Sequence, residues 1–463
     1  MKVPFWLVAV TSSLTTAFVI PNYRQTLHDL EVVDGDINEN ADFDDIPTAV
    51  YYDTALDIEE TLDDTLSYLD TLHTIADSYF NNPFDDDEEC LPEDIADLPH
   101  LRPPHHPPSD KTIYELITES KYTTILAKLI KDDEELTHLL NSTNTNHTLF
   151  APTDDAFKQI RHHPDHKPSK ELIRAVIKYH LVPGLHDTSS IFHTHTLPTL
   201  LQDPSLGTNL PQRLAARVGW RGLTLNFYSH IVAPDIAGTN GLIHAVSAPL
   251  LPPPSTQTLL DIVPTQFSTF NLGLLKTGLS SFLTTDSKSK GLTVFAPSNT
   301  AFQRLGFKIN AFLFSPVGEK YLRTLLQYHV VPGRTLYSDV IYTEKGEIKP
   351  FGVKGVKHLD LPTLLGDRMV GVDVVRFGPY ASLKVNGVQK VGFADALAED
   401  GNVHIVDRVL IPPKRVVDAV EEWEEEDELS VEDLKSRLAE WVKVDEDEDE
   451  DEGSELWTHG FEL

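Results

Sequence analysis

Apolar and polar positions alternate in short, sharply ended stretches through the middle of the chain, and one stretch occurs twice. The first copy is TLFAPTDDAF at 148–157, and the second is TVFAPSNTAF at 293–302. The leading apolar residues predict a buried strand, and the proline predicts its end because proline has no N–H for another ladder bond. Thr153 and Ser298 stand where a side chain caps a helix, so each copy predicts a strand followed by a short helix.

A second pair of stretches has helical spacing. ELIRAVIKYHLVPG at 171–184 matches KYLRTLLQYHVVPG at 320–333 without a gap. Apolar residues three and four positions apart, such as Ile173 and Val176, predict an amphipathic helix, and the Val-Pro-Gly step predicts where it stops.

A third pair predicts a closing strand. NGLIHAVSAPLLPP at 240–253 and DGNVHIVDRVLIPP at 400–413 both open on a turn signal and end on paired prolines. Segments between the second and third pairs read as hairpin strands. Each block therefore has helices early and strands late, which predicts an α+β fold.

Three landmarks recurring in the same order establish an internal repeat. We expect two globular domains, at 110–254 and 255–414. The chain has 463 residues and 40% hydrophobic content, which is enough for each domain to bury a core.

Acidic arms flank the two blocks. Residues 18–109 are rich in Asp and Glu, carry leucines near helical spacing between Leu62 and Ile75, and end in a proline- and histidine-rich linker. Self-repulsion and low hydrophobicity predict that these arms are largely disordered.

Residues 415–463 form a second acidic segment with one amphipathic element. SVEDL at 430–434 predicts a capped helix start, and the run 445–452 consists only of Asp and Glu. The predicted apolar stripe of this helix is Leu434, Leu438, Trp441 and Val442. We expect the tail to be a solvating spacer, with weak calcium binding through its carboxylates as the alternative.

The charge and the first residues limit the partners and the compartment. A net charge of −34 excludes nucleic acid as a probable class of partner, because phosphates need clustered Lys and Arg. Residues 1–17 predict a secretory signal peptide, with an uncleaved anchor or a buried strand as alternatives, and no later segment is long enough to span a membrane. We expect a secreted or cell-surface protein. The lumen of the vacuole or ER is the alternative.

Two sequons fit the secretory pathway, and the single cysteine limits how the domains are stabilised. Asn141 and Asn146 begin N-glycosylation sequons. Cys90 is the single cysteine, so the domains cannot contain an intrachain disulfide. Its acidic neighbours disfavour a reactive thiolate, and its state, free or intermolecular, stays open.

At the three repeated landmarks the chain resembles the fasciclin domain family, and the resemblance covers about residues 110–414. It implies two tandem β-wedge or sandwich domains with packed helices. It also implies membership of secreted or surface proteins that mediate adhesion and matrix contacts through a protein or glycan partner.

Histidines recur at equivalent places in the two blocks, which raises the question of catalysis or metal binding. A structural role is the stronger explanation, since each imidazole can be satisfied by a backbone carbonyl in the core and no Cys or paired acid stands beside it. We therefore predict no catalytic, cofactor or metal residue. The recurring residues are fold-signature positions: Tyr179, His180, His244, Tyr328, His329 and His404.

Other polar clusters have no counterpart in the opposite block. They are His162, His163, Asp165 and His166, together with His193 and His195. We expect no metal there. Asp154 and Asp155, replaced by Asn299 and Thr300 in the second block, are interpreted as helix-start capping residues.

One segment suggests a partner contact. APDIAGTNGLIH at 233–244 resembles the Pro-Asp-Ile segment that animal matrix members of the family use for integrin contact, which carries over to Asp235 and Ile236. The second block keeps Asp395 between alanines. An Asp that only makes a turn is the structural alternative.

These observations together predict a non-enzymatic secreted or lumenal protein that acts in cell adhesion or matrix contact. A soluble binding factor of the vacuole or ER is one alternative. A histidine-dependent enzyme is the other.

Overall fold

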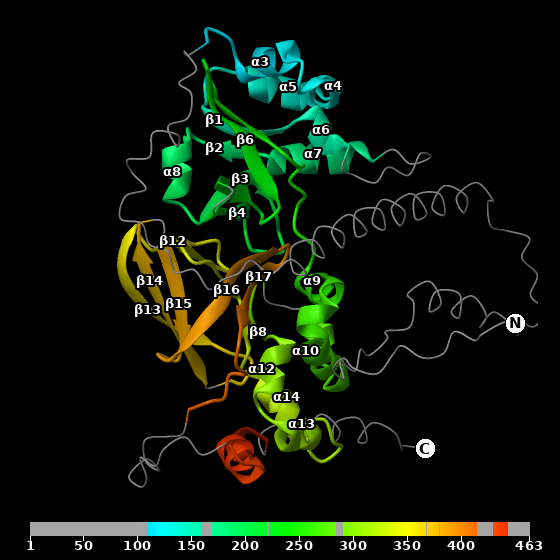
Figure 1. Cartoon of the computed structure of the whole chain (residues 1–463), viewed down its shortest axis with the longest axis vertical. Coiled ribbons are helices and arrows are strands. Elements are labelled where there is room, and N and C mark those ends of the chain that lie inside the picture. The colour runs from blue at the N-terminus through cyan, green and yellow to red at the C-terminus, as the bar shows by residue number, and fades with distance from the viewer. Residues whose placement is uncertain are drawn as a thin grey trace, which may run out of the picture. The chain divides into compact units, whose positions relative to one another are not determined.

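The computed structural model describes residues 109–158, 168–219, 222–283, 290–366, 368–378, 380–413 and 429–442 (Figure 1). The predicted signal peptide, nearly all of the N-terminal arm with Cys90, the cluster from His162 to His166 and the acidic run 445–452 lie outside the described residues. Among the described residues, no helix combines the length and hydrophobicity needed to cross a bilayer.

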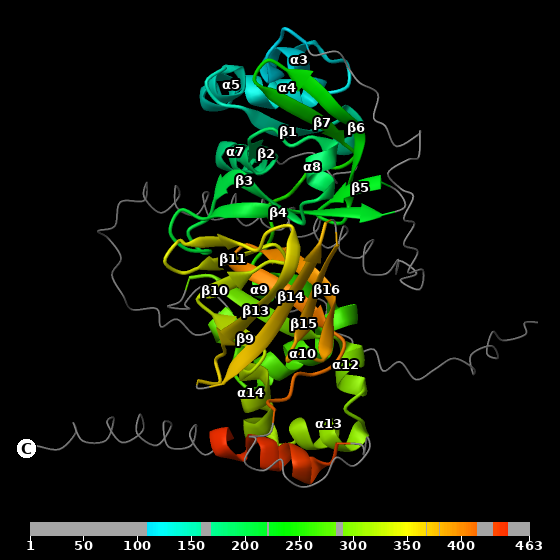
Figure 2. The ribbon, with the colours of Figure 1, turned by 90° about the vertical axis from the view of Figure 1, so that its left-hand side faces the viewer.

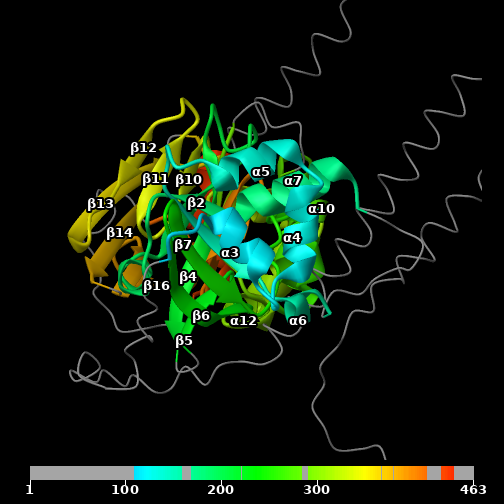
Figure 3. The ribbon, with the colours of Figure 1, turned by 90° about the horizontal axis from the view of Figure 1, so that it is seen from above.

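The first domain contains a seven-stranded sheet in the order β2-β1-β7-β6-β5-β4-β3. Helices α3, α4 and α5 pack together, with α3 against β7 (Figure 3). Its elements are α3 (Ile113–Glu119), α4 (Thr124–Lys131), α5 (Glu134–Asn141), β1 (His147–Pro152), α6 (Asp154–Phe157), α7 (Lys170–Tyr179), β2 (Leu181–Pro183), α8 (Thr188–Phe192), β3 (Thr196–Gln202), β4 (Pro211–Gly219), β5 (Gly222–Leu225), β6 (Ser229–Gly238) and β7 (Gly241–Val246).

The second domain repeats this sheet in the order β13-β14-β15-β16-β17-β8-β9 and adds a small sheet, β10-β11-β12. The predicted α+β class with two tandem domains is confirmed. Its elements are α9 (Thr256–Ile262), α10 (Pro264–Lys276), α11 (Ser280–Leu283), β8 (Leu292–Pro297), α12 (Asn299–Gln303), α13 (Phe307–Leu313), α14 (Glu319–Gln327), β9 (Val330–Pro332), β10 (Arg334–Leu336), β11 (Val340–Thr343), β12 (Ile348–Pro350), β13 (Lys354–Pro362), β14 (Met369–Phe377), β15 (Tyr380–Val385), β16 (Gln389–Ala398) and β17 (Gly401–Val406).

The repeated stretch forms a buried strand between the edge strand and the closing strand of each sheet, β1 between β2 and β7, and β8 between β9 and β17. All six residues of β1 and of β8 are buried, and each strand pairs in parallel with the closing strand, β7 or β17. Thr153 and Ser298 cap the following helix by accepting from the backbone N–H three residues on. The landmark is therefore a core strand with a capped helix behind it.

The glycine of the closing strand permits a close approach of backbones. A Cβ atom on Gly241 would lie 2.0 Å from the carbonyl oxygen of His147, and one on Gly401 would lie 2.2 Å from that of Leu292. Neither glycine has a positive φ. Asn240 and Asp400 lie in the turns before the closing strands, as expected, and the glycine that follows each of them brings two parallel strands together.

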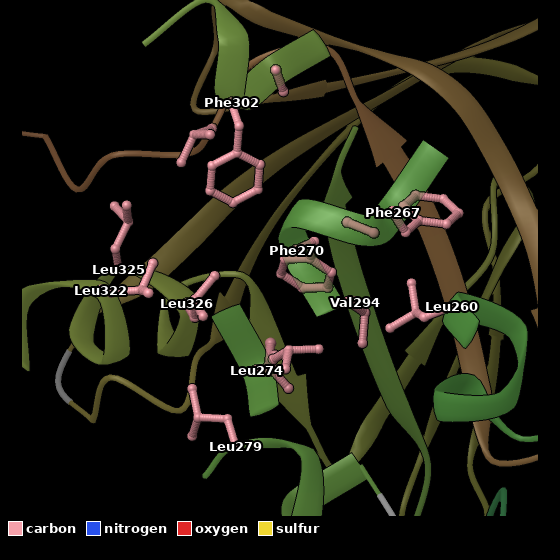
Figure 4. Packing of buried hydrophobic residues seen from close by; sticks show 14 of the residues in the cluster. Leu260, Phe267, Phe270, Leu274, Leu279, Val294, Phe302, Leu322, Leu325 and Leu326 are labelled. Atoms are coloured by element: carbon pink, nitrogen blue, oxygen red, sulfur yellow. The ribbon is translucent and has the colours of Figure 1, made fainter. Parts of the chain in front are cut away.

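Apolar side chains from helices and sheet fill each domain. In the second domain, Phe267, Phe270 and Leu274 of α10 pack with Phe302 and Val294 (Figure 4). These side chains are almost fully buried. The hydrophobic effect therefore stabilises the packing of this helical layer against β8.

Residues 431–442 form a helix that completes the core of the second domain. Ser430 caps it by accepting from Asp433 N at 3.1 Å. Leu434 and Leu438 are fully buried, and both belong to the same cluster as α10 and α14. The hydrophobic core of this domain therefore extends past residue 414.

We expect Leu434→Ala with Leu438→Ala to destabilise the second domain, because deleting a buried leucine side chain costs about 2 to 5 kcal/mol per site. Urea denaturation of the full chain measures the change. Glu432→Ala, on the exposed side of the same helix, is the control and should change stability little. Equal stability of the double variant and the parent would show that the helix does not contribute to the core.

Candidate functional site

His180 joins the end of α7 to the chain beyond β7. Its Nδ1 lies 2.7 Å from the carbonyl oxygen of Val176, and its Nε2 accepts a hydrogen bond from Leu250 N at 2.8 Å. A carbonyl can only accept and an amide N–H can only donate, so Nδ1 carries the proton. The imidazole is neutral and has no free nitrogen.

His329 repeats this geometry in the second domain, with Leu325 O at 2.8 Å from Nδ1 and Leu410 N donating to Nε2 at 2.8 Å. Burial lowers the pKa of His180 and that of His329 to about 4, because the charged imidazolium would lose its hydration. Both side chains serve as structural links between the end of a helix and the segment that follows the closing strand.

The histidine of each closing strand is satisfied in the opposite tautomer. His244 has Nε2 at 2.8 Å from His186 O, and its Nδ1 accepts from Asp235 N at 3.2 Å. Burial lowers its pKa and that of His404. In the second domain the corresponding bonds join His404 to Leu336 O and Asp395 N.

The four fold-signature histidines do not converge on one another or on a cleft. Each ring has both nitrogens engaged, so none is available as a general base or a metal ligand without breaking a buried bond. Within the described ranges, no group of three or more His, Cys, Asp or Glu side chains is arranged to hold a metal ion.

Asp235 lies in a bulged part of β6, at a φ of 55°, rather than in a loop. Its carboxylate accepts from Thr188 N at 2.8 Å and from Thr188 Oγ1 at 2.7 Å, which fixes the start of α8. Ile236 is partly buried against the core. Asp395 binds the backbone and hydroxyl of Ser338 in the same way.

The remaining predicted residues occupy separate places. Asn141 and Asn146 are exposed, as sequon asparagines must be for a glycan to project from the surface. Asp154 accepts from Ile125 N at 2.9 Å, and Asn299 accepts from Thr269 N at 2.9 Å. These two side chains therefore hold a neighbouring helix, α4 or α10, in addition to beginning their own.

The contact between the two domains is centred on Arg213 of β4, which the sequence analysis did not single out. Its guanidinium donates to Thr196 Oγ1 at 2.6 Å and to Tyr342 Oη at 2.8 Å. It lies 5.5 Å from the centre of the Tyr337 ring and 3.8 Å from the Asp339 carboxylate. The cation is buried but paired, as a charge inside a protein must be.

Arg217, four residues along the same face of β4, makes the second anchor. Its guanidinium donates to Ala394 O at 2.5 Å and lies against the rings of both Phe227 and Phe393, whose centres are 4.9 and 4.2 Å away and which also contact each other. The sequence signal for this domain contact was the spacing of two arginines on one face of a strand. Their partners in the second domain are more than 100 residues away in the sequence, so the signal alone did not identify the contact.

His193 and His195 also lie at this contact. The carbonyl oxygen of His193 accepts from the guanidinium of Arg376 at 3.3 Å. Burial lowers the pKa of His195, which Asp395 and Asp339 partly counteract. The two residues thus belong to the domain interface, as parts of a packed structure.

Carboxylates gather at the far side of the same contact. The carbonyl oxygen of Glu399 accepts from Gln212 Nε2 at 2.7 Å and from Ser205 Oγ at 2.9 Å. Burial, with Asp203 and Asp400 nearby, raises the pKa of the Glu399 side chain to about 6.

Repeated hydrogen bonds align β4 with β14. Tyr179 Oη donates to Arg213 O at 2.8 Å, and Tyr328 Oη lies 3.4 Å from Met369 O. Arg213 therefore corresponds to Met369. The second domain buries the face of β4 that carries Arg213. The equivalent face of β14 makes no such domain contact within the described residues, and Met369 is 57% exposed.

Strands β13, β14 and β15 lie side by side in the second sheet (Figure 2). Their outer face, meaning the side turned away from the core, is partly apolar. The register places Lys354, Phe377 and Tyr380 in one row across the three strands, followed by Val356 and Val375. Four apolar side chains at this end are exposed by 53% to 70%: Val353, Val356, Phe377 and Tyr380. An exposed cluster of this kind marks an interaction surface.

Comparison with known proteins connects this architecture with a family. The family model described as Fasciclin domain matches residues 121–252 and 265–412, which confirms the resemblance in both domains. Aurofusarin biosynthesis cluster protein S of Gibberella zeae is 28% identical over 338 residues, 68% of this chain and 81% of that protein.

Two further similarities have the same domain type in their names. Fasciclin-like arabinogalactan protein of Arthroderma benhamiae is 26% identical over 314 residues, 65% of this chain and 67% of that protein. A solved FAS1 domain pair from the insect cell adhesion molecule Fasciclin I is 16% identical with a TM-score of 0.29, and the match covers 61% of this chain and 95% of that one.

Acid should destabilise the fold through the buried histidines. The folded state keeps His329 neutral down to about pH 4, whereas the unfolded chain binds protons below about pH 6.5. Stability is therefore fully present above about pH 6.5 and is lost as the pH falls toward 4, on the order of 3 kcal/mol for this residue.

We expect His329→Gln to lose less unfolding free energy than the parent between about pH 7 and about pH 5, because the variant has no imidazole to protonate. Urea denaturation across this pH range is the measurement. Exposed His138→Gln serves as the control and should keep the parental pH dependence. Parallel profiles for parent and His329→Gln would contradict a neutral buried imidazole.

Arg213→Met, which installs the residue of the equivalent position in the second domain, should destabilise the domain contact by about 3 to 5 kcal/mol, because Asp339 stays buried without its cation. Asp339→Leu in the same chain should recover part of that loss. A double-mutant cycle by urea denaturation measures the coupling. Strictly additive losses would mean that the two side chains do not stabilise each other.

Proposed function

Because the chain belongs to the fasciclin domain family, we propose that it is a non-enzymatic protein of the secretory pathway that binds a surface or matrix partner, a protein or a glycan. The observation that carries this proposal is the outer face of β13–β15. Three of its exposed apolar side chains, Val356, Phe377 and Tyr380, lie on strands of a rigid sheet, and Val353 directly precedes β13. A rigid surface loses little conformational entropy when it binds.

The state of the histidines supports binding over catalysis. His180 and His329 are neutral, fully bonded and buried, so they resemble structural links and not acid–base groups. A histidine-dependent enzyme would need at least one ring nitrogen facing a substrate.

The contact predicted for Asp235 and Ile236 remains a second candidate surface. Substitution there has a structural cost, because Asp235 fixes the start of α8 through Thr188. Loss of attachment in an Asp235 variant is informative only when the melting curve is unchanged.

One relative suggests a second function. The name of Aurofusarin biosynthesis cluster protein S assigns that protein to a biosynthetic cluster. The same outer face could then bind an enzyme of a secreted pathway instead of a matrix component. Localisation of the tagged chain separates the alternatives, because the cell surface, the vacuole and the ER offer different partners.

Attachment to the surface or matrix fraction of the source cells tests the main proposal. We expect Val356→Ser with Phe377→Ser to reduce attachment several-fold at an unchanged melting temperature, because the exposed apolar area is lost. Leu275→Ser with Phe307→Ser, two exposed apolar residues on α10 and α13, is the matched control and should bind like the parent. Equal attachment by both double variants would exclude the outer face as the contact.

A further inference from the structure

A hollow of about 650 Å³ lies among the first helices of the first domain. Helices α3, α4 and α5 pack against one another (Figure 3), and each of them contributes side chains to its wall. The wall contains the partly buried Tyr114, the exposed charges of Lys131 and Glu134, and the exposed imidazole of His138. This volume is within the range of roughly 300 to 1,000 Å³ that small-molecule sites occupy.

The chemistry of the wall fits a carbohydrate. An aromatic ring can contact the C–H face of a sugar, and charged and hydroxyl side chains can exchange hydrogen bonds with the sugar's hydroxyl groups. A site for an ion would carry one sign of charge, whereas Lys131 and Glu134 carry opposite signs. The hollow therefore favours a neutral ligand with many hydroxyl groups.

Asn141 lines this hollow at the end of α5 and begins one of the chain's two sequons. The buried side chain of Asn240 donates through Nδ2 to the carbonyl oxygens of Leu140 and Ser142, both at 2.8 Å. The backbone on each side of Asn141 is thereby held in place. A group attached to this residue therefore starts from a fixed point at the rim of the hollow.

The side chain of Asn141 is oriented as well. Its Oδ1 accepts from Thr112 Oγ1 at 2.9 Å, at the residue that caps α3. Within the described part of the chain, no hydrogen bond occupies its Nδ2. A glycosylated asparagine keeps its carbonyl oxygen as an acceptor, so the bond to Thr112 is compatible with a sugar on Nδ2.

The second sequon lies differently. Asn146 is exposed, but the two residues after it belong to β1 and are buried. Thr148 Oγ1 donates to Gly184 O at 2.9 Å and accepts from His186 N at 2.9 Å. The two residues after Asn141, in contrast, are partly or fully exposed and lie in no strand. In the folded domain the first sequon is therefore the open one, and it is the one beside the hollow.

We propose that Asn141 carries an N-linked glycan whose inner N-acetylglucosamine units lie in the hollow, over Tyr114 and His138. The inference rests on the proposed passage through the secretory pathway, where the co-substrate is an oligosaccharide linked to a lipid diphosphate. Asn141 Nδ2 loses a proton and bonds to the anomeric carbon of the first sugar. The bond from that carbon to the diphosphate breaks, and the lipid diphosphate leaves.

This position of the glycan deepens the proposed function. Sugars over α3, α4 and α5 shield one end of the first domain from other proteins. The outer face of β13–β15 belongs to the second domain, so it stays open to a partner. The glycan thus restricts contact to the surface that carries the exposed apolar side chains.

Site mapping tests the attachment. The full chain is expressed behind an established secretory leader in a eukaryotic host, and peptide N-glycosidase in isotopically labelled water marks each formerly glycosylated asparagine as a labelled aspartate. We expect the label at Asn141. Thr143→Ala should abolish it without touching the bond between Asn141 and Thr112. An unmodified Asn141 in the secreted chain, with or without a glycan on Asn146, would overturn the proposal.

Labelling by diethyl pyrocarbonate tests where the sugars lie. His138 is the probe in the hollow, and His358, exposed on β13, is the internal control. We expect His138 to react several-fold more slowly in the glycosylated parent than in Thr143→Ala, with His358 equal in both chains. An endoglycosidase that leaves only the first sugar should keep part of this protection.

Equal reaction of His138 in both chains would show that the glycan projects into solvent, which would overturn its position in the hollow. Protection that disappears on trimming to the first sugar would assign the shielding to outer sugars and would also overturn it. Neither readout involves attachment through Val356 and Phe377, and the added leader makes both independent of residues 1–17. The failure of this inference is thus distinguishable from failure of the proposed function.

Discussion

The constraint on which each domain depends is that two buried imidazoles must stay neutral and fully bonded. His180 and His329 join the end of a helix to the chain beyond the closing strand, while His244 and His404 join the closing strand to the segment that follows the edge strand β2 or β9. Each ring donates one bond and accepts another, so its tautomer is determined by its position. In each domain the helix, the strand of the repeated stretch and the closing strand are thereby held in a single arrangement. An alternative packing would leave a polar group buried without a partner.

The periodicity of the sequence predicted much of this fold, and the reason is physical. Short-range signals such as Thr153 before a helix or a proline after a strand act on neighbouring residues, and they have the same effect in both repeats. The histidines were also predictable as core residues, since they recur on apolar faces. The role of Gly241 and Gly401 could not be predicted, because each glycine allows a close approach to a carbonyl that is more than 90 residues away in the sequence.

The domain contact could not be predicted for a related reason. Arg213 and Asp339 are informative only as a pair, and nothing local identifies one as the partner of the other. The helix at 431–442 was visible from its spacing, but its burial against α10 and α14 depends on a groove made by distant elements. The contact is also asymmetric, because Met369 stands where the first domain has Arg213. A second copy therefore could not extend the array through the same contact, which protects the chain from open-ended assembly.

The late position of that helix has a consequence for synthesis. The first domain has its complete sheet once residue 246 has been made, so it can fold while the rest of the chain is still being translated. The second domain has its last strand at 401–406, yet its core closes only with Leu434, Leu438 and Val442. During the interval the apolar side chains that share a cluster with these three residues stay partly uncovered. The helix at 431–442 is thus the last part of that core to emerge from the ribosome.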